Sequence, residues 1–187
     1  MPLPPISRVV AQRGKSTEGL GFGVGGTLYR LEADGSSLGN PGPAAGAAVL
    51  FYPDGRLLAE VAQPIGIATS NVAEYTALII GLRRAVLEGV ADLLVQMDSR
   101  LVINQVRRAW KIRAHHLQPF AECCWQLLSL FRDTHLVWVP REQNALADSL
   151  ATDAATKQAS YNAGLDDAEV PGEAFLPAGS FPAADAP

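Results

Sequence analysis

The chain contains 187 residues, of which 48% are hydrophobic and 18% are charged. That length suits one domain of ~100 to 150 residues with some chain left over, and the composition excludes a wholly disordered protein. The longest apolar runs fall far short of the ~18 residues that a membrane-spanning helix needs. The N-terminus also lacks the basic and apolar segments of a secretion signal. We therefore expect a cytoplasmic protein without a membrane segment.

The formal net charge of −4 conceals an uneven distribution. The last 30 residues hold five acids and no Lys or Arg, whereas the first 157 hold 15 basic and 14 acidic residues. Residues 100–113 contain five basic residues and no acid, followed by His115 and His116. Such a run is either the solvated face of a helix or a patch that binds nucleic acid. Cys123 and Cys124 are neighbours, which argues against an intramolecular disulfide and a cysteine zinc site.

The first predicted elements are strands. Residues 27–33 form an apolar segment that leads into a loop rich in Gly, Asn and Pro at 34–42. Residues 44–52 and 56–63 flank Pro-Asp-Gly, a tight-turn pattern that predicts an antiparallel hairpin. Residues 1–26 show no periodicity and are predicted to be a flexible leader.

The later elements alternate between helices and strands. Apolar residues at 75, 78, 79, 82, 85 and 86 have the spacing of a helix buried on one face, which predicts a helix over 72–87. The remaining predictions are a strand at 92–98, helices at 99–110 and 117–131, a strand at 135–139 and a last helix from Asn144. This order predicts an α/β domain, residues 27–157, with a mixed sheet and helices packed on its faces. Residues 158–187 are predicted to be a disordered tail rich in acids, Pro and Ala.

Four carboxylates fall at the predicted ends of elements, where an α/β sheet presents functional groups: Asp34, Glu74, Asp98 and Asp148. Three of them also have a structural explanation. Glu74 could complete a capping box with Asn71, Asp98 could cap the following helix, and Asp148 could stabilise a helix dipole. Asp34 has no obvious capping role, because it follows a strand and opens a loop.

Four sequence blocks carry these acids: DGSSLGNPG at 34–42, TSNVAEYTAL at 69–78, MDS at 97–99 and NALADSLA at 144–151. In order and separation they resemble the signature motifs of type 1 ribonuclease H. The resemblance implies a ribonuclease H-like fold, with a five-stranded mixed sheet of order 3-2-1-4-5 flanked by helices. It also implies an endonuclease that cuts the RNA strand of RNA/DNA hybrids and leaves 5′-phosphate and 3′-hydroxyl ends. We expect it to act as a monomer.

Converging carboxylates repel one another and raise each other's pKa unless hard cations with oxygen ligands bind between them. Mg²⁺ is the expected metal, with Mn²⁺ as a substitute. Two such ions about 3.5 to 4 Å apart can activate the attacking water and stabilise the leaving oxygen. The resemblance implies that Asp34 bridges both ions and that Asp148 binds the ion that holds the water. It places Glu74 and Asp98 on the leaving-group side.

Selection of RNA rests on contacts to the 2′-hydroxyl group. The resemblance assigns such contacts to five residues: Gly35, Ser36, Asn40, Asn71 and Glu74. It also assigns Thr69 and Asn71 to a pocket for a phosphate of the DNA strand, and Asn71 could cap a helix at the same time. Arg100 stands where some relatives have Gln, and its role stays open.

Two departures from the family pattern affect substrate binding. Residues 110–119 are too few to hold the Lys-rich helical protrusion of many bacterial members. The chain therefore resembles the protrusion-less branch, and we expect weaker, more salt-sensitive binding. The expected partial substitutes lie in the basic stretch: Arg107, Arg108, Trp110, Lys111 and Arg113. Arg141 is the candidate substitute for a His that assists product release in many members, or else a surface Arg without a role in turnover.

Two other functions compete with this prediction. The first is a catalytically inactive nucleic-acid-binding module of the same fold, for which the expected trace is a missing acid. The second is a related nuclease with broader duplex specificity. The presence of all four acids favours the hybrid-cleaving enzyme. Trp125 and Trp138 lie in periodic apolar segments, and we expect them in the core.

Overall fold

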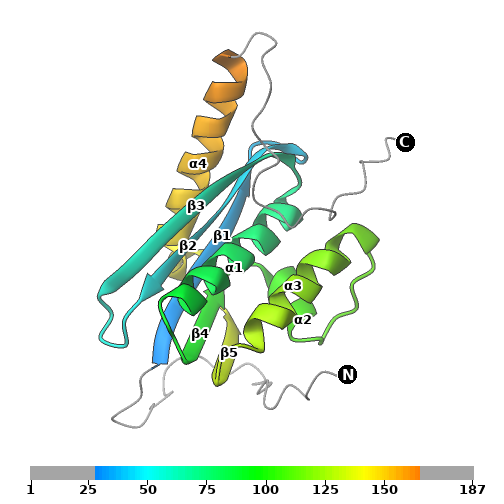
Figure 1. Ribbon diagram of the computed structural model, residues 1–187. Coiled ribbons are helices and arrows are strands. Elements are labelled where there is room, and N and C mark those ends of the chain that lie inside the picture. Colours follow the sequence, from blue (N-terminus) through cyan, green and yellow to red (C-terminus); the bar gives the residue numbers. More distant parts are fainter. Residues whose placement is uncertain (1–27, 165–187) are drawn as a thin grey trace.

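The computed structural model describes residues 28–164, which form a five-stranded sheet with helices on both faces (Figure 1). The strands are β1 (Leu28–Ser37), β2 (Gly42–Phe51), β3 (Leu57–Ala68), β4 (Asp92–Met97) and β5 (Asp133–Trp138). The helices are α1 (Ser70–Leu87), α2 (Arg100–Val106), α3 (Gln118–Leu128) and α4 (Ala145–Gly164), with 3-10 turns η1 (His115–Leu117) and η2 (Arg141–Gln143). The predicted leader, and the predicted tail beyond residue 164, lie outside the described residues.

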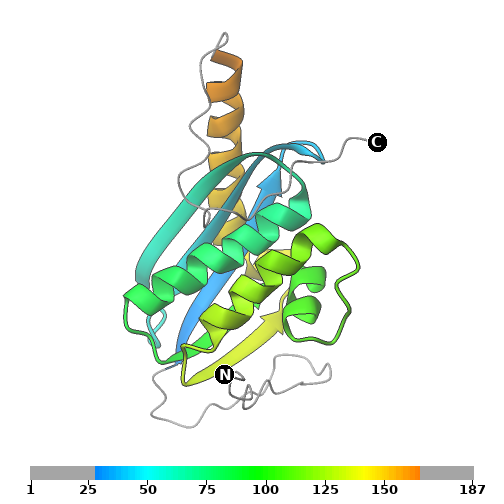
Figure 2. The same cartoon turned by 45° about the vertical axis from the view of Figure 1, so that its right-hand side comes forward.

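The strand order is β3-β2-β1-β4-β5, which confirms the fold that the family resemblance implies. β1 pairs antiparallel with β2 and parallel with β4. Of the outer strands, β3 is antiparallel to β2 and β5 is parallel to β4. Helices α1 and α3 cover one face of the sheet and α4 covers the other (Figure 1). Figure 2 shows α4 running past the edge of the sheet.

The main core lies between the sheet and helices α1 and α3. Five of the six positions that predicted the amphipathic helix are buried there: Tyr75, Leu78, Ile79, Leu82 and Ala85. Strand β2 is almost wholly buried because it is covered on both faces, and it is rich in Ala and Gly. A Cβ atom on Gly46 would lie 2.6 Å from the backbone nitrogen of Ala77, so α1 packs directly on the backbone of β2.

The structure corrects several predicted boundaries. Strand β3 continues to Ala68 and does not end at residue 63. Strand β1 continues to Ser37, because its pairing with β2 extends that far. Asp34 therefore lies inside the strand and not in a loop after it. Helix α2 ends at Val106 and not at Trp110, because the backbone of Arg108 turns into the left-handed region (φ 60°). Helix α4 continues to Gly164, past the predicted domain end at residue 157. No helix within residues 28–164 is both long and apolar enough to span a membrane.

A buried hydrogen bond joins α1 to α2. The hydroxyl of Tyr75 donates to Oε1 of Gln105 at 2.9 Å. We expect Tyr75→Phe to lower the free energy of unfolding by about 1 to 2 kcal/mol, because the buried Gln105 oxygen loses its partner. Urea denaturation measures this change. Tyr29→Phe is the matched control, since no hydrogen bond of the Tyr29 hydroxyl is found among residues 28–164, and an equal loss in both variants would contradict the assignment.

Candidate active site

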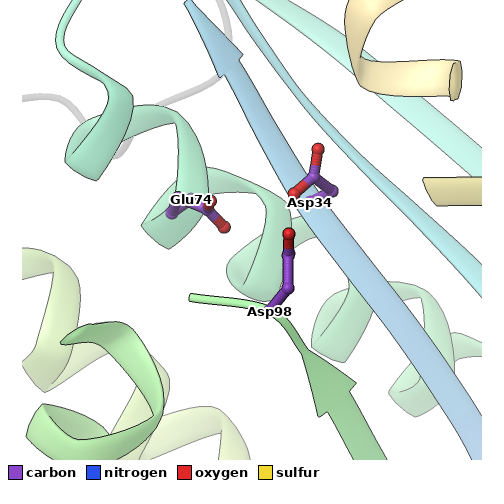
Figure 3. Close-up of side chains that lie close together, drawn as sticks. All are labelled: Asp34, Glu74 and Asp98. Carbon is purple, nitrogen blue, oxygen red and sulfur yellow. The ribbon is translucent and has the colours of Figure 1, made fainter. Parts of the chain in front are cut away.

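Three of the four predicted acids converge in the structure (Figure 3). Asp34 comes from β1, Glu74 from the first turns of α1, and Asp98 directly follows β4. One carboxylate oxygen of each residue lies within 4.8 Å of the other two. Within residues 28–164, this is the single group of three or more His, Cys, Asp or Glu side chains that meets this distance.

The strand register and a glycine contact bring the three acids together. Glu32 of β1 pairs with Gln96 of the parallel strand β4. Asp34 lies two residues after Glu32, and Asp98 lies two residues after Gln96, so the register brings the two acids to the same level. Gly35 packs against α1 so closely that a Cβ atom there would lie 2.1 Å from the backbone nitrogen of Glu74. Only a residue without a side chain permits this approach, which places Glu74 beside Asp34.

Burial and mutual repulsion disfavour the charged forms of these acids. Burial, followed by the neighbouring Asp98 and the charge of Asp148, raises the pKa of Asp34 to about 8. Burial and the charges of Asp34 and Asp98 raise the pKa of Glu74 well above its usual value. One carboxylate oxygen of Glu74, Oε2, is buried and has no hydrogen-bond partner among the described residues. A cation between these oxygens would offset the repulsion and give Glu74 Oε2 a partner.

Asp148 lies outside the tight group but close to it. It is half-buried in α4, and its carboxylate accepts a hydrogen bond from the guanidinium of Arg141 in η2. Its negative charge contributes to the raised pKa of Asp34, and the positive charge of Arg141 opposes that rise. The structure therefore assigns the exposed Arg141 a contact with the fourth acid.

Three of the residues expected to contact RNA or the DNA phosphate lie at the start of α1: Asn40, Thr69 and Asn71. Thr69 is the N-cap of α1, and its side chain accepts a hydrogen bond from Val72 N. Asn71 is therefore not the helix cap; it is the second residue of α1. Asn40 orients the same turn, since its Oδ1 accepts from Ser70 N at 3.2 Å. Ser36 points elsewhere, and its hydroxyl contacts that of Thr152 in α4 at 3.5 Å.

The N-cap of α2 differs from the prediction in the same way. Ser99, and not Asp98, caps this helix, because the Ser99 side chain accepts from Val102 N at 3.4 Å. The Asp98 carboxylate is therefore not used for capping. This leaves it available to the acidic group.

Part of the basic stretch lines an open hollow of about 600 Å³ between the end of α2 and the start of α3. Arg108, Trp110 and Lys111 are among its lining residues, whereas Arg107 and Arg113 are not. The side chain of Trp110 is 52% exposed. The hollow thus combines two basic side chains with an exposed aromatic ring, which are the groups that bind nucleic-acid backbones and bases.

The prediction that Trp125 and Trp138 lie in the core is wrong for Trp138. Trp138 is 36% exposed at the end of β5, and its indole N–H donates to the backbone oxygen of Asp98 at 2.9 Å. The guanidinium of Arg100 lies over its ring, 4.0 Å from the centroid. Trp125 packs against the core but is only half-buried, with Arg108 over its ring. Arg100 stands where some relatives have Gln, and this difference was the sequence signal that could have indicated its contact with Trp138.

The strand order and the carboxylate group define the ribonuclease H-like class of domains. A family model described as reverse transcriptase-like matches residues 32–154. Ribonuclease H of Idiomarina loihiensis is 33% identical over 143 residues, which cover 68% of this chain and 88% of that relative. The chain belongs to the ribonuclease H family.

Other relatives match the same region. Bifunctional protein Rv2228c of Mycobacterium tuberculosis is 47% identical over 125 residues, which cover 66% of this chain. The chain spans about a third of that relative's length, 34%. Ribonuclease HI of Halobacterium salinarum is 43% identical over 121 residues, covering 65% of this chain and 61% of that relative.

Solved structures agree with this assignment. The N-terminal RNase H domain of Rv2228c from Mycobacterium tuberculosis superposes with a TM-score of 0.71 at 43% identity, covering 73% of this chain and 99% of that one. LC11-RNase H1 in complex with RNA/DNA hybrid gives a TM-score of 0.65 at 33% identity, covering 69% and 97%.

The raised pKa of Asp34 predicts how stability depends on pH when no metal is present. In the unfolded chain Asp34 ionises near pH 4, but in the folded protein it holds its proton until about pH 8. The folded state therefore binds more protons in this window, so the stability contribution of Asp34 falls as pH rises from about 4 to 8.

We expect Asp34→Asn, in EDTA, to gain stability relative to the unmodified protein between pH 5 and pH 8. The gain should exceed about 1.4 kcal/mol, the equivalent of one pKa unit. Urea unfolding at several pH values measures it, with Asp153→Asn, an exposed acid of α4, as the control. A pH-independent difference between Asp34→Asn and the unmodified protein would contradict the electrostatic assignment.

Proposed function

We propose that this protein is an endoribonuclease that hydrolyses the RNA strand of RNA/DNA hybrids, leaving 5′-phosphate and 3′-hydroxyl ends. Asp34, Glu74, Asp98 and Asp148 are its catalytic residues. The observation that carries the proposal is the convergence of three carboxylates, within 4.8 Å of one another, in a domain of the ribonuclease H family. The choice of substrate is supported by LC11-RNase H1, which has been solved in complex with an RNA/DNA hybrid.

Divalent cations fit this group of acids. Its members are hard oxygen ligands, two of them have raised pKa values through burial and like charge, and Glu74 Oε2 has no partner among the described residues. We propose two Mg²⁺ ions, replaceable by Mn²⁺, held by Asp34, Glu74, Asp98 and Asp148. When bound, such ions lower the pKa of water and stabilise negative charge on the attacking and leaving oxygens.

The chain's own residues then position the reacting groups. On cation binding, Asp34 and Glu74 would release to solvent the protons that their raised pKa values retain in the metal-free protein, and their carboxylates would hold the cations. Asp148 must divide its oxygens between Arg141 and this role. All four acids come from one chain, so a monomer contains the complete set.

Two regions are proposed to bind the substrate. The turn before α1, with Asn40, Thr69 and Asn71, and the backbone at Gly35 and Ser36 are proposed to contact the sugar–phosphate chains of the hybrid. The hollow at the end of α2 supplies Arg108, Trp110 and Lys111. Arg107, Arg113 and Arg141 add positive charge nearby. The described residues between α2 and α3 form no helical protrusion. We therefore propose that the basic loop of residues 107–113 binds the DNA strand in its place.

The substrate assignment is tested with end-labelled RNA/DNA, RNA/RNA and DNA/DNA duplexes in Mg²⁺, Mn²⁺ or EDTA. We expect cuts only in the RNA strand of the hybrid, and none in EDTA. Hybrid binding without cleavage in either metal would favour a catalytically inactive binding module. Cleavage of RNA/RNA at a similar rate would favour a nuclease of broader specificity.

Asp98→Asn should abolish metal-dependent cleavage while leaving the fold intact. The substitution keeps the shape of the side chain but removes the charge that attracts a cation, so we expect kcat to fall more than about a hundredfold. Single-turnover cleavage and circular dichroism measure the two effects. Asp153→Asn should retain activity, and undiminished cleavage by Asp98→Asn would contradict the proposal.

Lys111→Ala should weaken hybrid binding in a salt-dependent way. If Lys111 contacts one phosphate, its loss reduces the slope of log K against log salt concentration by about 1. Fluorescence anisotropy in Ca²⁺ or EDTA measures binding without cleavage. Lys157→Ala, which removes an exposed lysine from α4, is the matched control and should leave the slope unchanged. Equal slopes for Lys111→Ala and the unmodified protein would exclude this contact.

A further inference from the structure

Asn144 connects the elements that carry the acids. It is fully buried and lies directly before α4, the helix that holds Asp148. Its side-chain nitrogen donates to the backbone oxygen of Ala33 at 2.9 Å and to Oδ1 of Asp98 at 3.0 Å. Ala33 immediately precedes Asp34 in β1. One amide group therefore joins β1, the end of β4 and the start of α4.

This side chain is not used as an Asn at a helix start usually is. Asn144 occupies the N-cap position, since its backbone oxygen accepts from Asp148 N at 3.1 Å. An N-cap Asn normally accepts a first-turn N–H through Oδ1. Here Oδ1 is buried and finds no partner among the described residues. Both hydrogens of the amide instead reach acceptors, which uses its full donor capacity.

The partners of Asn144 require a neutral donor. The Ala33 carbonyl and the Asp98 carboxylate are both acceptors, so an ionised Asp at position 144 could form neither bond, and a protonated one could form only one of them. A Lys or Arg could donate but would bring a positive charge against the acids and oppose cation binding. A neutral amide fixes the orientation of a carboxylate without changing the charge of the group.

We infer that Asn144 is a positioning residue that orients the Asp98 carboxylate and fixes it relative to Asp34, ready for cation binding. This inference rests on the proposed function of the same acids. Groups that orient metal ligands typically change metal affinity or activity about 10- to 100-fold when removed. The role of Asn144 is exerted through Asp98, since no contact of Asn144 with the substrate is required.

Two variants separate positioning from helix capping. Ser and Asp are both favoured at N-cap positions, so Asn144→Ser and Asn144→Asp keep a residue suited to the start of α4. Asn144→Asp also keeps the size of the side chain but loses at least one of the two donated bonds, because a carboxyl group has at most one hydrogen to donate. Asn104→Ser is the matched control, because it removes an Asn whose amide donates to the backbone oxygen of Arg100, within α2.

Mg²⁺ binding, measured by calorimetry without substrate, is the first readout. For Asn144→Ser we expect about a tenfold weaker affinity, and for Asn104→Ser no change. In hybrid cleavage, the kcat of Asn144→Ser and Asn144→Asp should fall about tenfold or more, while KM for the hybrid stays within about twofold. Denaturation curves define the temperature at which each variant is folded for these measurements.

Unchanged Mg²⁺ affinity and kcat in folded Asn144→Ser would overturn the inference. An activity loss that disappears on cooling, as the folded fraction recovers, would also overturn it in favour of a structural role. Failure of the unmodified protein to cleave any hybrid would refute the proposed function. The calorimetric comparison would still decide whether Asn144 positions a metal ligand.

Discussion

Asp34, Glu74 and Asp98 are held close together although their like charges repel one another. The cost of this arrangement is visible in the raised pKa of Asp34, about 8, and in the raised pKa of Glu74. A fold that holds acids in this way gives up stability near neutral pH unless cations bind. The same repulsion is the source of cation affinity, since each bound ion removes it. The chemistry of the site therefore depends on the rigidity of the elements that carry the acids.

That rigidity comes from contacts outside the group of acids. The parallel register of β1 and β4 aligns Asp34 with Asp98, and Gly35 lets α1 approach β1 without an intervening side chain. Small residues in β2 allow the same close approach of α1 one strand further along. Asn144 completes the arrangement by tying β1 and Asp98 to the start of α4. These contacts are all backbone or buried polar interactions, which tolerate little displacement.

The resemblance of four motifs to those of ribonuclease H implied the strand order and the converging acids, of which three form the tight group. The apolar spacing predicted the buried face of α1. The sequence did not predict the pairing of the exposed Arg141 with the half-buried Asp148, because this contact depends on how η2 meets α4. Local pattern also placed Trp138 in the core, whereas the edge position of β5 leaves one side of its ring to Arg100. Strand β1 exceeded its predicted length because Gly35 and Ser36 remain paired with β2, although both residue types usually favour turns.

The most direct test of this account is a carbon-13 NMR titration of the Asp34 carboxyl group, first in EDTA and then with saturating Mg²⁺. The account predicts a pKa of about 8 in EDTA and an ionised carboxylate across the neutral range once Mg²⁺ is bound. Titration near the ordinary value of about 4 in EDTA, with no response to Mg²⁺, would contradict it.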